Sequence, residues 1–263
     1  NVQLDVVDLD SAVIAHIQLE PLPKRAVQAS LEGLGNSGSI GLGGNFSWDN
    51  RNLFKGGELL RLSLGGSITE QRNSTSNTWL IDARELNTAV ALNIPKLVLP
   101  ENWLPLKAKQ WSPKTEISAK ASYQFRANEF NRLNLTANLD YRWRIGKASH
   151  LLTPAQLSFV QIDFNGSGQT TPFLFNGFQD LFFSATSYRF SESWTSGNLR
   201  FFLATELESG GHLFSAAGIQ ELAGTPLARY LKSSIDFRTY KSLVRKRELA
   251  FRTFIGVSEA WGT

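Results

Sequence analysis

Apolar and polar residues alternate along this chain over long stretches. From Leu133 to Arg144, leucine, alanine, tyrosine and tryptophan occupy the odd positions, while asparagine, threonine, aspartate and arginine occupy the even positions. A period of two residues places the two sets on opposite faces of a β-strand. The stretch is longer than the roughly 9–11 residues that a tilted strand needs to cross a bilayer.

The same alternation recurs along most of the chain. In a soluble sandwich the apolar face packs on a second sheet, whereas in an outer-membrane barrel it faces lipid and the polar face lines a wet lumen. Repetition on this scale favours an all-β fold, a large transmembrane antiparallel up-and-down β-barrel. The eleven candidate strands lie at about 26–33, 39–49, 58–70, 85–94, 115–126, 131–144, 155–163, 180–190, 197–208, 231–241 and 247–261.

Composition is consistent with a barrel. Hydrophobic residues make up 42% of the 263 residues and the mean hydropathy is −0.18. No apolar run approaches the ~20 residues of a transmembrane helix. In a barrel, lumen-facing residues cancel lipid-facing ones in every window, so such averages are expected. The absence of cysteine excludes disulfides and thiolate metal sites.

The net charge is +4 and the isoelectric point is near 9.4. Lysine and arginine are dispersed, with no interleaved aromatic platform, so we expect no nucleic-acid partner. Several charged residues fall at polar positions of the candidate strands and are predicted to face the lumen: Arg61, Lys120, Asp140, Arg142, Asp236 and Arg238. They favour either a polar pore or a structural ladder of charges inside a plugged barrel.

Residue patterns that carry chemistry are missing. The three histidines lie in unrelated segments, and the sequence contains no paired carboxylates, phosphate loop or nucleophile motif with usable spacing. We therefore expect no catalytic, cofactor-binding or metal-binding residues, and a protein that is not an enzyme.

The segment from Gly41 to Gly65 resembles the first full hairpin of the BamA/TamA outer-membrane insertase superfamily, the bacterial surface antigens. The asparagines tolerate left-handed turn geometry, the glycines let the chain reverse, and the leucine and phenylalanine can fold back at the membrane edge. The most specific match is the hairpin motif Asn50, Arg51, Asn52, Leu53, Phe54, Gly56, Gly57 and Glu58.

Other segments resemble one branch of that superfamily. Ile94–Pro100, Pro113–Ile117 and Tyr141–Trp143 are similar to the TamL-type, TamA-like lipoproteins of Bacteroidetes. On this resemblance, His150 is expected at a turn or an interface. Residues 1–25 resemble the final strands of the last POTRA domain, and residues 26–263 resemble strands 1 to 11 of the barrel, ending at the sixth extracellular loop.

The resemblance implies a barrel of about sixteen strands with a weak seam between its first and last strands. The predicted first strand is short and flanked by glycine; its seam residues are Ala26, Gln28, Ser30, Glu32 and Gly33. Closing strands are not in this sequence, so we expect a chain that is incomplete or is completed by another polypeptide.

The resemblance also implies a function: an insertase or translocation component that assists assembly of outer-membrane proteins or envelope components through this seam. Implied partners are outer-membrane lipid and lipopolysaccharide, client outer-membrane proteins, and a TamB-like periplasmic protein or accessory lipoproteins. The implied location is the outer membrane of a diderm bacterium, with the N-terminal part in the periplasm. A passive channel or uptake barrel is the alternative.

Overall fold

The computed structural model describes most of the chain, and everything below concerns these residues: 2–9, 12–19, 22–36, 38–72, 79–99, 112–127, 129–164, 180–216, 218–219, 221–222, 225–227, 229–243 and 247–260.

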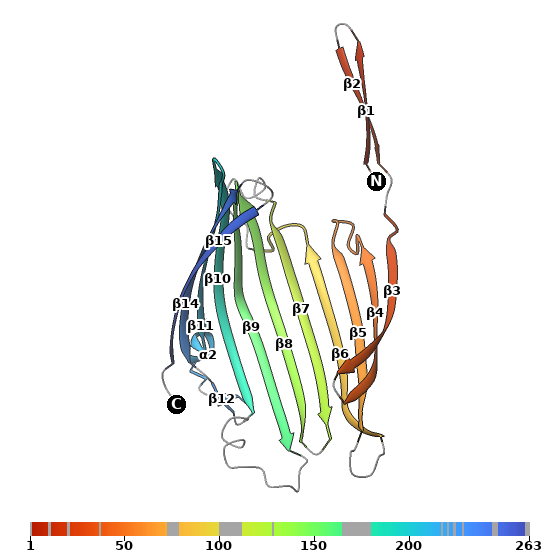
Figure 1. Ribbon diagram of the computed structural model, residues 1–263, viewed down its shortest axis with the longest axis vertical. Helices are drawn as coiled ribbons and strands as arrows, with labels where there is room; N and C mark the ends of the chain where they lie inside the picture. The colour runs from red at the N-terminus through yellow and green to blue at the C-terminus, as the bar shows by residue number, and fades with distance from the viewer. Residues whose placement is uncertain are drawn as a thin grey trace.

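One large antiparallel sheet dominates the structure (Figure 1). Each strand pairs with the next along the chain, so the topology is up-and-down, and the predicted all-β class is confirmed. The eleven strands of this sheet are β3 (Arg25–Asn36), β4 (Ser39–Arg51), β5 (Leu59–Arg72), β6 (Trp79–Ile94), β7 (Lys114–Arg126), β8 (Phe130–Ile145), β9 (Ala148–Phe164), β10 (Leu181–Ser196), β11 (Leu199–Gly210), β14 (Tyr230–Leu243) and β15 (Arg247–Ala260).

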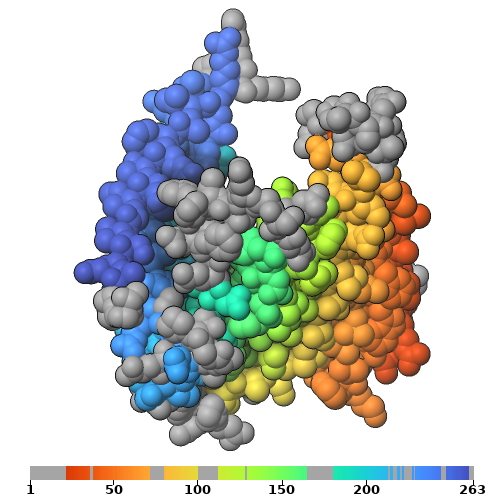
Figure 2. Space-filling view, turned by 90° about the horizontal axis from the view of Figure 1, so that it is seen from below, coloured from red at the N-terminus to blue at the C-terminus, as the bar shows by residue number. Residues whose placement is uncertain are grey.

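The sheet is curved but not closed. β3 and β15 stand at its two ends and do not pair with each other. Figure 2, seen along the strands, shows the first strands in red and orange and the last strands in blue on opposite sides of an open space. Each edge strand therefore has one partner among the described residues.

Smaller elements accompany the sheet. The hairpin of β1 (Val2–Leu9) and β2 (Ala12–Leu19) extends beyond the end of the sheet at which β3 begins (Figure 1). This confirms the predicted β pair, while its assignment to a POTRA domain stays a prediction. Between β11 and β14 lie a short helix, α2 (His212–Ala216), and a small hairpin of β12 (Glu221–Leu222) and β13 (Thr225–Pro226).

Several strands are longer than predicted. β3 has 12 residues, so the first strand is not short, and β6 begins at Trp79 instead of near residue 85. β9 begins at Ala148, seven residues before its predicted start, and runs through Pro154. Proline has no N–H to donate to the ladder. Between the partners of Leu139 and Tyr141 on β8, and between those of Ala185 and Ser187 on β10, β9 has one extra residue. A bulge in β9 therefore accommodates the proline within the strand.

The apolar face of the sheet is the more exposed face. On β5, Leu62, Leu64 and Ile68 are 41%, 52% and 50% exposed, whereas polar-face residues such as Ser118 and Ser158 are buried. Among the described residues, the buried hydrophobic side chains are Tyr141, Phe182, Ala185 and Leu227. Side chains crowd together on the concave side of a curved sheet, so this pattern indicates a sheet curved around its polar face.

Candidate functional site

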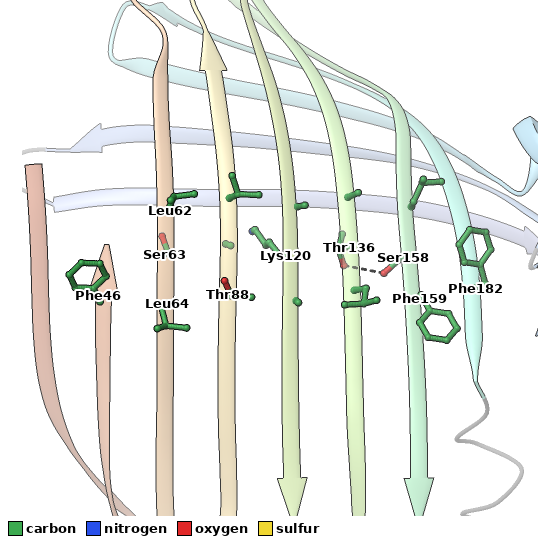
Figure 3. A pocket seen from close by; sticks show the side chains of 17 residues that line it. Phe46, Leu62, Ser63, Leu64, Thr88, Lys120, Thr136, Ser158, Phe159 and Phe182 are labelled. Atoms are coloured by element: carbon green, nitrogen blue, oxygen red, sulfur yellow. Dashed lines mark hydrogen bonds between the residues drawn. The ribbon is translucent and has the colours of Figure 1, made fainter. Parts of the chain in front are cut away.

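The apolar face forms a continuous surface across the strands. Cross-strand register aligns Phe46, Leu64, Leu135 and Phe159 in one row, with Thr88 and Ala121 between them. A groove of about 720 Å³ crosses β4 to β10 on this surface (Figure 3), and small residues such as Ala121 contribute to its lining. Phe46 and Phe182 stand at its two ends (Figure 3). No second layer of protein covers this row among the described residues.

Aromatic side chains gather on the apolar face at the end of the sheet nearest the β1–β2 hairpin. Trp143 and His150 stack with ring centroids 5.1 Å apart, and Nδ1 of His150 lies 2.8 Å from the hydroxyl of Tyr188. Trp194 and Phe201 stack at 5.3 Å on β10 and β11. His150 thus belongs to a strand and not to a turn, as the Trp143–His150 register shows.

The six predicted lumen charges lie on the polar face, and five of them form ion pairs. Arg61 donates to both carboxylate oxygens of Asp49 at 2.8 Å. Arg142 lies 3.3 Å from Asp140. Asp236 lies 2.6 Å from Arg238 and 2.9 Å from Arg252. The sixth, Lys120, has no ion pair with the part of the chain that the structure describes.

Sequence analysis missed three partners on this face: Asp49, Glu116 and Arg252. Each lies at polar parity, so extending the alternation would have placed it on this face. The ion-pair partners of these residues could not be predicted from the sequence, because they depend on strand register. Asp49 is opposite Arg61, and Arg252 is opposite Arg238. A ladder of such pairs can stiffen the polar face, although half-exposed ion pairs contribute little stability each.

The predicted seam residues lie on β3, the first edge of the sheet. Ala26, Gln28, Ser30 and Glu32 share the polar face, while Gly33 lies on the apolar face opposite Leu42. Side chains of β3 form no hydrogen bond or ion pair with β4 among the described residues, so backbone pairing and apolar pairs such as Val27–Trp48 hold this strand.

Glycines weaken the same pairing further. Five successive cross-strand pairs each contain a glycine: Leu31–Gly44, Glu32–Gly43, Gly33–Leu42, Leu34–Gly41 and Gly35–Ile40. Contacts between opposite side chains are the main source of pairing specificity and stability in a sheet. These five pairs lack a side chain on one strand, and one half of the β3–β4 ladder therefore rests on its backbone hydrogen bonds.

The hairpin motif forms a compact turn between β4 and β5. Oε2 of the buried Glu58 accepts the backbone N–H groups of Phe54 at 3.1 Å and Gly56 at 3.0 Å. The side-chain oxygen of Asn52 accepts the N–H of Gly57 at 3.0 Å. Asn52 has φ 60°, as predicted, and Gly57 has φ 83°. The backbone N–H of Glu58 itself, followed by those of Gly56 and Phe54, lowers the pKa of this carboxyl below its ordinary value.

Two expectations for this turn are wrong. Asn50 does not take a left-handed conformation, because it belongs to β4 and pairs with Arg25. Phe54 does not fold back onto the sheet, since the residue is 68% exposed. Arg51 has a role that sequence analysis missed. Its N–H donates to the carbonyl of Lys24 at 2.7 Å and its guanidinium to that of Pro23 at 2.9 Å, which fixes the linker before β3.

Two other features are absent from the described ranges. No helix there has the length and apolarity to cross a membrane. No group of three or more metal-ligating side chains converges there either.

Comparisons with known proteins add little. No family model matches the sequence, and no curated protein does. Among solved structures, CdiB from Acinetobacter baumannii aligns with a TM-score of 0.24 and 11% identity, over 98% of this chain and 66% of that chain. This chain thus spans slightly less than two thirds of its length. A score this low leaves the functional argument to the geometry described above.

Proposed function

We propose that the large sheet is part of the wall of an outer-membrane β-barrel, with its apolar face in contact with lipid and its polar face inward. One observation carries this: large apolar side chains on a single face stay exposed from β4 to β15. An exposed apolar surface of this extent is an interaction surface. Other described parts of the chain cover it at its β10 end, where Phe182 packs on Phe214 of α2 and beside Leu227. Strands of 12 to 17 residues are long enough to cross a bilayer.

Within that wall, we propose an insertase or translocation role that uses β3 as a lateral seam. The support is the free edge of β3 together with its five glycine-containing pairs. An open strand edge accepts a client strand by backbone hydrogen bonding. The sequence resemblance adds a BamA/TamA-like identity of the TamL type, an outer-membrane location with the β1–β2 hairpin in the periplasm, and the lipid, client and periplasmic partners named above.

Arginine scanning of two adjacent residues tests the membrane placement. Leu64 and Ser63 are neighbours on β5, and their side chains lie on opposite faces. In the full-length protein folded into lipid vesicles, Leu64→Arg should lower the free energy of unfolding by about 2–4 kcal/mol if it meets the hydrocarbon. Ser63→Arg is the matched control and should cost clearly less. Equal losses for the two variants would contradict a lipid-facing apolar surface.

Photo-crosslinking tests the seam. A photoreactive amino acid is placed at Gln28 on β3 or, as a control, at Ser47, its direct partner on β4. During synthesis of outer-membrane proteins in cells, we expect adducts with unfinished clients from position 28 and none from position 47. Adducts from neither position, or from both equally, would refute client pairing at this edge.

A passive channel is the second candidate, supported by Lys120, which stands on the polar face without an ion pair among the described residues. Conductance in planar bilayers separates the two. A large steady conductance that changes with Lys120→Glu supports the channel, whereas a sealed lumen favours the seam.

A further inference from the structure

A basic cavity opens on the polar face at the end of the sheet nearest the β1–β2 hairpin. It has a volume of about 430 Å³ and lies where β7 begins and β8 ends. Four basic side chains, Lys114, Arg142, Arg144 and Arg189, contribute to its lining, and no acidic residue does among those that the structure describes. Three serines, 112, 149 and 191, supply hydroxyl groups.

Strand register arranges these groups as a grid. Lys114, Arg142 and Arg189 lie in one row, because Arg142 faces Lys114 on one side and Leu151 on the other, and Leu151 faces Arg189. Arg144 and the serines opposite it form the next row on the same face. Neighbouring strands are about 4.8 Å apart and alternate residues about 7 Å apart, so both rows are within reach of one small ligand.

The basic groups are only partly neutralised. Arg142 lies 3.6 Å from Glu116 and 3.3 Å from Asp140, and Arg189 lies 2.7 Å from Glu206. The side chains of Lys114 and Arg144 have no ion pair or hydrogen bond with described residues. The cavity therefore holds two cations whose charge no described side chain balances.

The local register is also unfavourable without a ligand. Lys114 and Arg142 are directly opposite each other, and like charges in that position destabilise a sheet. Glu116 and Asp140, the next pair on this face, repel likewise, but Arg142 bridges both. Elsewhere on the polar face, Asp49 faces Arg61 and Arg189 faces Glu206. Where Arg238 faces Arg252, the carboxylate of Asp236 bridges the two arginines. An anion between Lys114 and Arg144 would relieve the remaining repulsion.

We propose that this cavity binds a phosphoryl group. Guanidinium groups hold phosphate oxygens through paired N–H donors, and lysine adds a point charge. A phosphate with two negative charges matches the two unbalanced cations, and its tetrahedral oxygens can accept hydrogen bonds from both rows of the grid. The source is either free phosphate or a phosphorylated lipid headgroup at the rim. The proposal rests on the polar face alone and is independent of the seam.

Calorimetric titration of the full chain, folded in a phosphate-free maltoside detergent at about 0.15 M salt, tests this site. Inorganic phosphate and a water-soluble short-chain phosphatidic acid are the two probes. The double variant Lys114→Gln, Arg144→Gln should bind phosphate about tenfold or more weakly. The matched control, Lys120→Gln with Lys232→Gln, removes two polar-face lysines outside the cavity and should bind normally.

The outcomes separate the sources of the ligand. Tighter binding of phosphatidic acid, lost in the double variant, assigns a headgroup, and equal binding of both probes assigns free phosphate. No phosphate binding by the unmodified protein, or equal weakening in the control, overturns the proposal. If the double variant does not fold, Arg144→Lys replaces it. This variant keeps the positive charge but loses the paired N–H donors of the guanidinium group, so it should bind phosphate with intermediate affinity.

Discussion

The two edges of the sheet are held in different ways. β15 is tied to its neighbours by charged side chains: Arg252 donates to both oxygens of Asp236 at 3.0 and 2.9 Å, and Glu248 accepts from Arg200 of β11 at 2.9 Å. β3 has no such tie to β4 among the described residues, and glycine occupies one side of five successive pairs.

This difference makes β3 the weaker edge. Both strands are paired over most of their length, so both have backbone hydrogen bonds on one side. The two strands differ in the contacts between side chains, which add to the stability that backbone hydrogen bonds give the pairing. Local opening follows the least stabilised element. The N-terminal edge is therefore the one suited to exchange partners, and the C-terminal edge is suited to stay in place.

The largest effect is expected from loosening β15. Asp236→Asn keeps the shape of the side chain but removes the charge that holds Arg238 and Arg252, so amide exchange along β15 should rise roughly tenfold. Hydrogen-exchange mass spectrometry of the folded protein measures it. The control is Asp163→Asn on β9, an exposed aspartate without an ion pair to any described residue. Unchanged exchange on β15 would remove the contrast between the edges.

A smaller effect is expected from strengthening β3. A side chain added at Gly33 meets nothing within 4 Å and would lie opposite Leu42. Gly33→Val should slow amide exchange of β3 about two- to fivefold, through a new cross-strand contact and lower backbone entropy in the unfolded chain. If the seam proposal holds, client assembly should slow too.

Gly41→Val provides the opposing control. There a Cβ would lie 2.5 Å from the carbonyl oxygen of Ile68 and 2.6 Å from the side chain of Thr69. The backbone cannot yield easily, so this substitution should destabilise the β4–β5 pair. Slower exchange of β3 in both variants would show that the effect is not pairing with β4.

The smallest effect is expected at the Glu58 turn between β4 and β5. Hydrogen bonds to the ionised carboxyl lower its pKa in the folded protein, so the turn is stabilised above the unfolded value near 4.5 and loses this contribution as pH falls through the lower folded value. The amide NMR shifts of Phe54 and Gly56 should titrate with a midpoint below that of a free glutamate. Glu58→Gln should abolish the titration, and a midpoint above 4.5 would contradict the hydrogen bonds.

Much of the fold was predictable because alternation is a local signal. Leu133 to Arg144 shows its two faces in the order of its residues, and the polar parity of Arg61 and Asp236 follows from their neighbours alone. Strand ends were harder to predict from the sequence, as β9 shows: its predicted start followed Pro154, but a bulge in β9 around Pro154 lets the strand begin at Ala148. The prediction that Phe54 folds back was wrong, since the residue stays exposed in a turn built around the Glu58 carboxylate.

The amino-acid sequence alone determined that the chain forms many amphipathic strands and which side chains share a face, because a two-residue period is fixed by strand geometry. Tertiary structure decided which residues meet across strands. The strand register places Asp49 opposite Arg61, Gly43 opposite Glu32 and Lys114 opposite Arg142. It also decided that the apolar face stays exposed while the polar face is curved inward. The register and the exposure of each face depend on contacts between residues far apart in the chain. The alternation within a single strand carries no information about the neighbouring strand.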